Sequence, residues 1–163
     1  MKKEEFISLI KVNRNLIYKI CVSYCKDEEN RKDLEQEILL QLWKSLKSFD
    51  GRVKITTWMY RIGLNTAISF YRNENKGNVK KIQLDESIIT LSIDEYNPEK
   101  DQNIILLYQF IEKLGEMDKA LILLYLDDVK HKDIAEILGI SESNVATKIS
   151  RIKLTLKDQF KTI

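Results

Sequence analysis

The stretch that decides the fold lies near the C-terminus, at residues 130–156, and reads KHKDIAEILGISESNVATKISRIKLTL. Its first half carries apolar residues spaced along one side of a short helix: Ile134, Ala135, Ile137 and Leu138. Gly139 follows directly and supplies the left-handed backbone conformation that commonly ends a helix. Ser141 is a favourable N-cap for a second helix, and Glu142 suits the positive end of that helix. The pattern therefore predicts two helices joined by a tight turn.

The second of these predicted helices has an apolar face and a polar face. At about 100 degrees of rotation per residue, the apolar residues line up on the inner side: Val145, Ile149, Ile152 and Leu156. The outer face carries small hydroxyls and an arginine: Ser143, Thr147, Ser150, Arg151 and Leu154, flanked by Ala146 and Lys157. Hydroxyls bind base edges in either hydrogen-bonding sense, and arginine binds guanine through two hydrogen bonds. The segment from about Asp128 to Leu156 is therefore typical of a helix-turn-helix that reads the major groove of DNA.

Basic side chains around this motif are candidates for contacts to DNA phosphates, which set register without reading sequence. They are Lys130, His131, Lys132, Lys148 and Lys153. Charge alone would favour a plain helical hairpin with a solvated basic face. The spacing of Ala135, Gly139, Val145 and Ile149 favours the DNA reader over that hairpin.

The composition of the whole chain predicts an all-α protein. Among 163 residues there are only one proline and five glycines, which leaves little room for many tight turns. The formal net charge of +2 neither requires nor excludes a polyanionic partner. The charges are nevertheless clustered, because basic blocks at 44–80 and 141–163 alternate with acidic blocks at 27–37 and 85–101.

Several classes of protein are disfavoured by what the sequence lacks. No stretch approaches the ~18 apolar residues that span a bilayer, so we expect a cytoplasmic protein with no membrane insertion. Cys21 and Cys25 lie far from His131, the one histidine, so we expect no metal site and interpret both cysteines as small buried hydrophobic residues. No glycine-rich phosphate loop or nucleophile beside a carboxylate pair is present. We therefore expect no catalytic residue, no cofactor and no enzymatic activity.

Helical patterning in the N-terminal part predicts three helices. Apolar spacing gives a first helical region from about Lys3 to Cys25. Asp27 can cap a second helix that runs to about Lys47 and is ended by the residues 49–51. Thr56 or Thr57 can cap a third helix to about Asn73, which is apolar on nearly every side and should lie inside a bundle.

Patterning is lost between residues 73 and 101, where Gly77 and Pro98 interrupt an acidic stretch, and it resumes from Ile104 to Leu126 with a pause at Gly115. This predicts two small helical domains, residues 1–75 and 101–163, joined by a flexible linker at 76–100.

The second predicted helix has an unusual leucine on its polar side. When Leu42 is placed at the centre of the core side, Leu40 falls nearly opposite. The polar residues beside it are Asp33, Gln36, Glu37 and Lys44, and Trp43 lies on the border between the two faces. Single exposed leucines are common, so this face is either ordinary surface or a site where a partner binds.

Two blocks of sequence carry a resemblance to a known family. The string DLEQEILLQLWKSLKSFDG at residues 33–51, followed by ITTWMYRIGLNTAISFYR at 55–72, resembles the second conserved region of sigma-70 factors of the extracytoplasmic-function (ECF) group. The string LDDVKHKDIAEILGISESNVATKISRIKLTL at 126–156 resembles their fourth conserved region. Together the blocks cover nearly all the chain outside the linker. Two motifs in the right order are more specific than either alone.

The resemblance implies a transcription initiation factor that binds core RNA polymerase, directs it to promoters and helps to open the duplex, with an anti-sigma factor as a possible further partner. The residues implied to dock on the clamp helices of the largest polymerase subunit are Asp33, Gln36, Glu37, Leu40 and Trp43. Those implied to bind the minus-10 element lie within 49–61 and are Arg52, Lys54, Thr57, Trp58 and Arg61, although Trp58 fits a core position equally well. Those implied to bind the minus-35 element are Lys130, Lys132, Ser143, Thr147, Lys148, Ser150 and Arg151.

Some positions depart from the family pattern. Asp128 stands where glycine is frequent, and Ala146 and Ser150 are small where larger contact residues often occur. Two other readings stay open: a stand-alone helix-turn-helix regulator, which would normally be a dimer that reads two half-sites, and a sigma-like adaptor that binds polymerase without initiating.

Overall fold

The computed structural model describes residues 2–75 and 102–162, and the secondary structure of these residues is helical, with no strand. They form two compact units, one on each side of the segment that is not described. The all-α class with two small helical parts is therefore confirmed. The predicted linker at 76–100 lies outside the described residues, so its boundaries and flexibility stay predictions.

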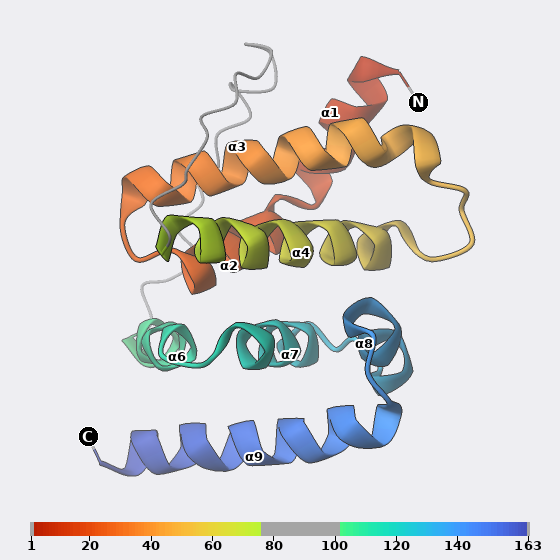
Figure 1. Cartoon of the computed structure of the whole chain (residues 1–163). Helices are drawn as coiled ribbons and strands as arrows, with labels where there is room; N and C mark the ends of the chain where they lie inside the picture. The colour runs from red at the N-terminus through yellow and green to blue at the C-terminus, as the bar shows by residue number, and fades with distance from the viewer. Residues whose placement is uncertain (1, 76–101, 163) are drawn as a thin grey trace. The chain divides into compact units, whose positions relative to one another are not determined.

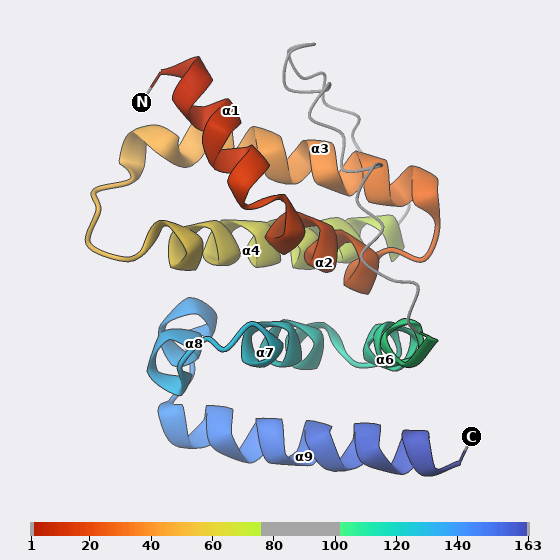
Figure 2. The same ribbon diagram turned by 180° about the vertical axis from the view of Figure 1, so that it is seen from behind.

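The N-terminal unit is a small helical bundle. Its helices are α1 (Lys3–Val12), α2 (Arg14–Tyr24), α3 (Glu28–Ser45), the short 3-10 helix η1 (Leu46–Ser48) and α4 (Ile55–Asn75). Helices α3 and α4 lie side by side, and α1 and α2 cover one side of the pair (Figures 1 and 2). Side chains buried between them include Phe6, Ile17, Ile20, Leu34, Ile38, Leu42, Met59 and Leu64. Each such burial contributes about 1.5–3 kcal/mol, so this core holds the unit together.

The first predicted helical region is two helices rather than one. Asn13 leaves the helical conformation with φ −108° and ψ 17°, and its side-chain Nδ2 donates a hydrogen bond of 2.9 Å to the Leu9 carbonyl. Asparagine side chains compete in this way with the main-chain ladder. The break lets α1 and α2 pack in different directions against α3 and α4, as Figure 2 shows.

The cap predicted for α3 is confirmed, whereas the cap predicted for α4 is wrong. The Asn30 backbone N–H donates to Asp27 Oδ1 at 2.9 Å. In contrast, α4 begins at Ile55, and the Trp58 N–H already donates to the Lys54 carbonyl at 3.1 Å. Thr57 therefore lies inside the first turn and is buried, so its side chain is part of the packing rather than the helix start.

The C-terminal unit consists of α6 (Gln102–Glu112), α7 (Glu116–Leu126), α8 (His131–Leu138) and α9 (Glu142–Lys161). Helix α8 lies at the start of α9, and α7 crosses α9 further along (Figure 1). The buried side chains include Ile111, Leu121, Leu124, Ile134 and Val145. An edge-on contact between Phe110 and Phe160, with ring centroids 4.9 Å apart, ties α6 to the end of α9.

No helix that the structure describes combines the length and the apolar composition that a membrane crossing requires.

Candidate nucleic-acid interface

The turn between α8 and α9 has the geometry that the sequence predicts. Gly139 ends α8 with φ +69°, and the Ile140 N–H donates to the Ala135 carbonyl at 3.1 Å. Ser141 then caps α9, because its Oγ accepts a hydrogen bond of 3.2 Å from the Asn144 N–H. The turn is therefore fixed by main-chain and cap hydrogen bonds, and it sets the direction of α9 relative to α8.

Helix α9 presents one face to the core and the opposite face to solvent. The buried residues are those predicted for the inner face: Val145, Ile149, Ile152 and Leu156. The exposed residues are those predicted for the outer face: Ser143, Thr147, Ser150, Arg151 and Leu154. Lys148 is half-buried at the edge between the two faces. The rotation predicted for this helix is thus confirmed, although the contacts of its outer face with DNA stay a prediction.

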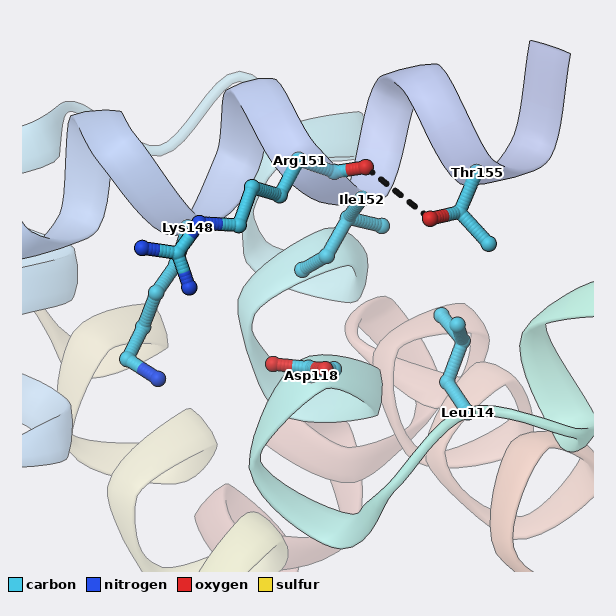
Figure 3. Close-up of a pocket in the computed structure, with 6 residues that line it drawn as sticks. All are labelled: Leu114, Asp118, Lys148, Arg151, Ile152 and Thr155. Carbon is cyan, nitrogen blue, oxygen red and sulfur yellow. Dashed lines mark hydrogen bonds between the residues drawn. The ribbon is translucent and has the colours of Figure 1, made fainter. Parts of the chain in front are cut away.

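A shallow hollow lies beside this outer face, between the start of α7 and the middle of α9. It has a volume of about 220 Å³ and is lined by Leu114, Asp118, Lys148, Arg151, Ile152 and Thr155. Figure 3 shows the side chains of Lys148 and Asp118 facing it, and the side chain of Arg151 extending from α9 on the same side as Lys148. Two cationic side chains and one carboxylate therefore share this edge of the unit. A DNA phosphate that approached the hollow would be attracted by Lys148 and Arg151 of α9 and repelled by the carboxylate of Asp118 of α7.

The start of α8 adds further positive charge to the same unit. Lys130 is the N-cap residue of α8, with no hydrogen bond from its side chain to the helix end, and Lys130, His131 and Lys132 are all exposed. A helix N-terminus carries partial positive charge and free N–H groups, which favour a phosphate. This end of α8 therefore suits the phosphate contacts predicted for Lys130 and Lys132.

The predicted polymerase-binding face of α3 is more covered than its helical wheel indicates. Leu40 is only 8% exposed, so the prediction of an exposed leucine is wrong. Trp43, one turn further along the same side, makes an edge-on contact with Phe6 of α1, with centroids 5.0 Å apart. Helix α1 therefore packs against Trp43 on this side of α3. The polar residues Asp33, Gln36 and Glu37 stay partly exposed.

The minus-10 candidates separate into exposed and buried groups. Arg52 and Lys54 are exposed in the loop before α4, and Arg52 Nε forms an ion pair of 3.1 Å with Asp50. Thr57 and Trp58 are each only 8% exposed, and the Trp58 ring packs on Phe49 with centroids 5.2 Å apart.

Direct base contact by Thr57 or Trp58 is therefore not available in this conformation, and of the two readings of Trp58 the core position is the one observed. Arg61 is half-buried on the second turn of α4.

The cysteines are buried, as expected. Cys21 and Cys25 are each 3% exposed and form no disulfide. Burial, and after it the nearby carboxylate of Glu35, raises the pKa of the Cys21 thiol well above its usual value. The described residues contain no cluster of side chains suited to hold a metal ion.

Two features were missed by sequence reasoning. Asp128 has φ +57°, the one non-glycine residue of the described segments in the left-handed region, and it forms the turn that leads from α7 to α8. The sequence did offer a sign of this left-handed conformation, because Asp128 stands where glycine is frequent in the family. Asp118 faces Lys148 across the hollow (Figure 3), and no local pattern could have paired residues so far apart in the sequence.

Comparison with known proteins agrees with the two-unit arrangement. The Sigma-70 region 2 family matches residues 9–77, and the Sigma-70, region 4 family matches residues 104–156. RNA polymerase sigma factor YlaC of Bacillus subtilis is 31% identical over 132 residues, which are 79% of this chain and 76% of that protein. The chain belongs to the ECF group of sigma-70 factors.

Other relatives match this sigma factor over almost its whole length. RNA polymerase sigma factor SigV of Bacillus subtilis is 29% identical over 97% of this chain and 99% of that protein. The sigma factor RpoE of Bartonella quintana, solved in complex with the anti-sigma factor NepR, has the same fold. Its TM-score is 0.72 at 17% identity, over 97% of this chain and 98% of that one. This sigma factor is therefore a transcription initiation factor built from two helical units.

Proposed function

We propose that this sigma factor binds core RNA polymerase through the exposed polar side of α3 and reads promoter DNA with both units. The observation that carries the proposal is the outer face of α9, where hydroxyl groups and Arg151 project from a helix whose other side is buried. Such a helix is free to enter the major groove of an upstream, minus-35 element. Ser143, Thr147, Ser150 and Arg151 then meet base edges.

Phosphate contacts position α9 on the duplex. Lys148 at the edge of α9, together with Lys130 and Lys132 at the start of α8, supplies positive charge around the reading face. Such contacts hold the register of the protein on DNA, and they make binding salt-dependent because they release counterions.

The loop before α4 binds the minus-10 region. Arg52 and Lys54 are exposed there, and Arg61 follows on α4. Opening the duplex requires a protein that holds the unpaired strand, because unstacking costs a few kcal/mol per base. Positive charge along this loop attracts the backbone of that strand. Trp58 supports the loop by packing on Phe49, and Thr57 is buried beside it in the first turn of α4.

Core polymerase binds the side of α3 that carries Asp33, Gln36 and Glu37, where the Glu37 carboxylate accepts a hydrogen bond of 2.8 Å from Gln41. The largest subunit's clamp helices are the expected partner. Trp43 borders the surface and is held by Phe6, whereas Leu40 belongs to the core. Nucleotidyl transfer stays with the polymerase, and this chain contributes binding and no catalysis.

A Glu37→Lys variant tests the polymerase surface. It should keep its helical circular dichroism but lose co-elution with core enzyme, because it reverses a charge at the centre of the interface. The matched control is Glu29→Lys, an exposed reversal in the first turn of the same helix. Equal binding by both variants would place the polymerase surface elsewhere.

An anti-sigma factor is the second proposed partner. The fold neighbours were solved as complexes, RpoE with NepR and CnrH with the cytosolic domain of CnrY. A regulator of that kind would act by covering the polymerase-binding or DNA-binding surfaces. Pull-down with this chain as bait, repeated with excess core polymerase, tests the idea, because a competing regulator is displaced by the polymerase.

A further inference from the structure

The hydroxyl of Thr147 is committed to its own helix. Its Oγ1 donates a hydrogen bond of 3.0 Å to the carbonyl of Ser143, one turn earlier on α9. A hydroxyl has a single hydrogen, so this bond uses its donor and leaves only lone pairs for any partner outside the helix. Threonine in helices commonly makes this bond, which also fixes its side-chain rotamer. Thr147 therefore presents to solvent an acceptor and a methyl group.

The other polar side chains of the same face differ from Thr147 in hydrogen-bonding sense. Arg151 only donates. Ser150 is exposed, and a serine hydroxyl can donate or accept. Ser143 and Ser141 share a hydrogen bond of 3.2 Å. Within about one turn, the outer face of α9 therefore carries an acceptor at Thr147, a donor at Arg151 and a group that can do either at Ser150.

The four bases differ in whether their major-groove edge can donate a hydrogen bond to an acceptor such as Thr147 Oγ1. Guanine presents N7 and O6 there and thymine presents O4, all of which are acceptors, whereas only adenine N6 and cytosine N4 carry hydrogens to donate. An acceptor placed against guanine or thymine meets another lone pair. Thr147 lies near the N-terminal end of α9, the part of a recognition helix that reaches base edges.

We propose that Thr147 is a specificity-determining residue that accepts a hydrogen bond from the amino group of an adenine or cytosine in the upstream element. This inference rests on the proposed entry of α9 into the major groove. It adds a chemical rule, that the base beneath Thr147 carries an exocyclic amino group. The back-bond to Ser143 sets the rule, because without it the hydroxyl could equally donate to guanine or thymine.

The test uses holoenzyme made from the full chain and core polymerase. A preferred upstream element is first selected from a random DNA library, and binding is then measured to every single-base variant. Thr147→Val keeps the shape of the side chain but removes its acceptor. Thr147→Ser keeps the hydroxyl and should keep the preference. Thr155→Val is the matched control, because Thr155 makes the same kind of back-bond, to Arg151 at 3.1 Å, but lines the hollow instead.

Wild-type holoenzyme should prefer adenine or cytosine at one position by about 2- to 12-fold, the range of one neutral hydrogen bond, and Thr147→Val should abolish that preference alone. Replacing the base with an analogue that lacks the amino group, purine for adenine or 2-pyrimidinone for cytosine, should weaken wild type by the same factor. The analogue should leave Thr147→Val unchanged.

Three results separate failure of this inference from failure of the proposed function. If Thr147→Val changes no position, or if the amino-free analogue weakens wild type on neither strand of the base pair that Thr147→Val changes, the inference is wrong while α9 can still read DNA. If the analogue weakens Thr147→Val as much as wild type, another residue binds the amino group. If wild type shows no upstream preference at all, the proposed role of α9 itself is refuted.

Discussion

Gly63 lies where α4 packs closely against α2, and it gives a quantitative test of the core of the N-terminal unit. A Cβ placed on Gly63 would lie 2.9 Å from Ile20 Cδ1 and 3.8 Å from Ile38 Cγ2. Alanine in a helix interior gains about 0.8–1.0 kcal/mol over glycine, whereas overpacking a core costs about 1–3 kcal/mol. Ile20 Cδ1 is the flexible end of its side chain, so part of the clash relaxes. We therefore expect Gly63→Ala to lower the free energy of unfolding by about 1 kcal/mol.

The Ile20→Val background reverses the sign of this effect. It removes Cδ1 at a cost of about 0.5–1.5 kcal/mol, and the remaining neighbour of the new methyl is at an ordinary contact distance. Gly63→Ala should then stabilise the unit. Both tryptophans, Trp43 and Trp58, lie in this unit, so urea unfolding followed by tryptophan fluorescence reports on it alone. A gain of about 1 kcal/mol from Gly63→Ala in both backgrounds would refute the close approach of α2 and α4.

Three further predictions concern the turn, the buried thiol and the reading helix. Asp128→Gly should raise the free energy of unfolding of the C-terminal unit by about 0.5–1 kcal/mol, because φ is +57° there. Asp127→Gly, at φ −90°, should lower it, and chemical unfolding followed by circular dichroism compares the two. Burial raises the pKa of Cys21 in the folded chain, so its contribution to stability is complete below the unfolded thiol pKa of about 8.5 and is lost as pH rises above it. Urea titrations should show this decline, and a Cys21→Ala variant should lack it. Arg151→Ala should weaken binding to the preferred upstream element by ~1–3 kcal/mol and relax the base preference at one base pair. Lys148→Ala should instead weaken binding to all sequences alike and lower the slope of log affinity against log salt concentration by about one. The opposite assignment, measured on single-base variants at several salt concentrations, would contradict the observed rotation of α9.

The helix-turn-helix could be predicted from sequence because its determinants are local. Gly139 must adopt a left-handed conformation, and Ser141 caps the helix that begins beside it. The buried face of α9 repeats at the helical period, so a wheel was enough to rotate it correctly.

The predictions that failed depended on contacts between elements. A helical wheel drawn for α3 alone placed Leu40 in solvent, because a wheel does not show which other parts of the fold pack against that side. Thr57 offered a plausible cap by residue type, but packing of α4 starts the helix earlier and buries it. Asp118 illustrates the same limit, because its place beside the reading helix follows from how α7 crosses α9.

The central claim is that this chain gives core polymerase the ability to start transcription at particular promoters. The most direct measurement is run-off transcription by Bacillus subtilis core enzyme on a library of random promoter sequences, with and without the chain, followed by sequencing of the transcripts. We predict transcripts that depend on the chain and start downstream of a shared pair of sequence elements, with the upstream one lost in Arg151→Ala. Co-elution with core enzyme without any chain-dependent transcript would instead identify an adaptor that occupies polymerase and does not initiate.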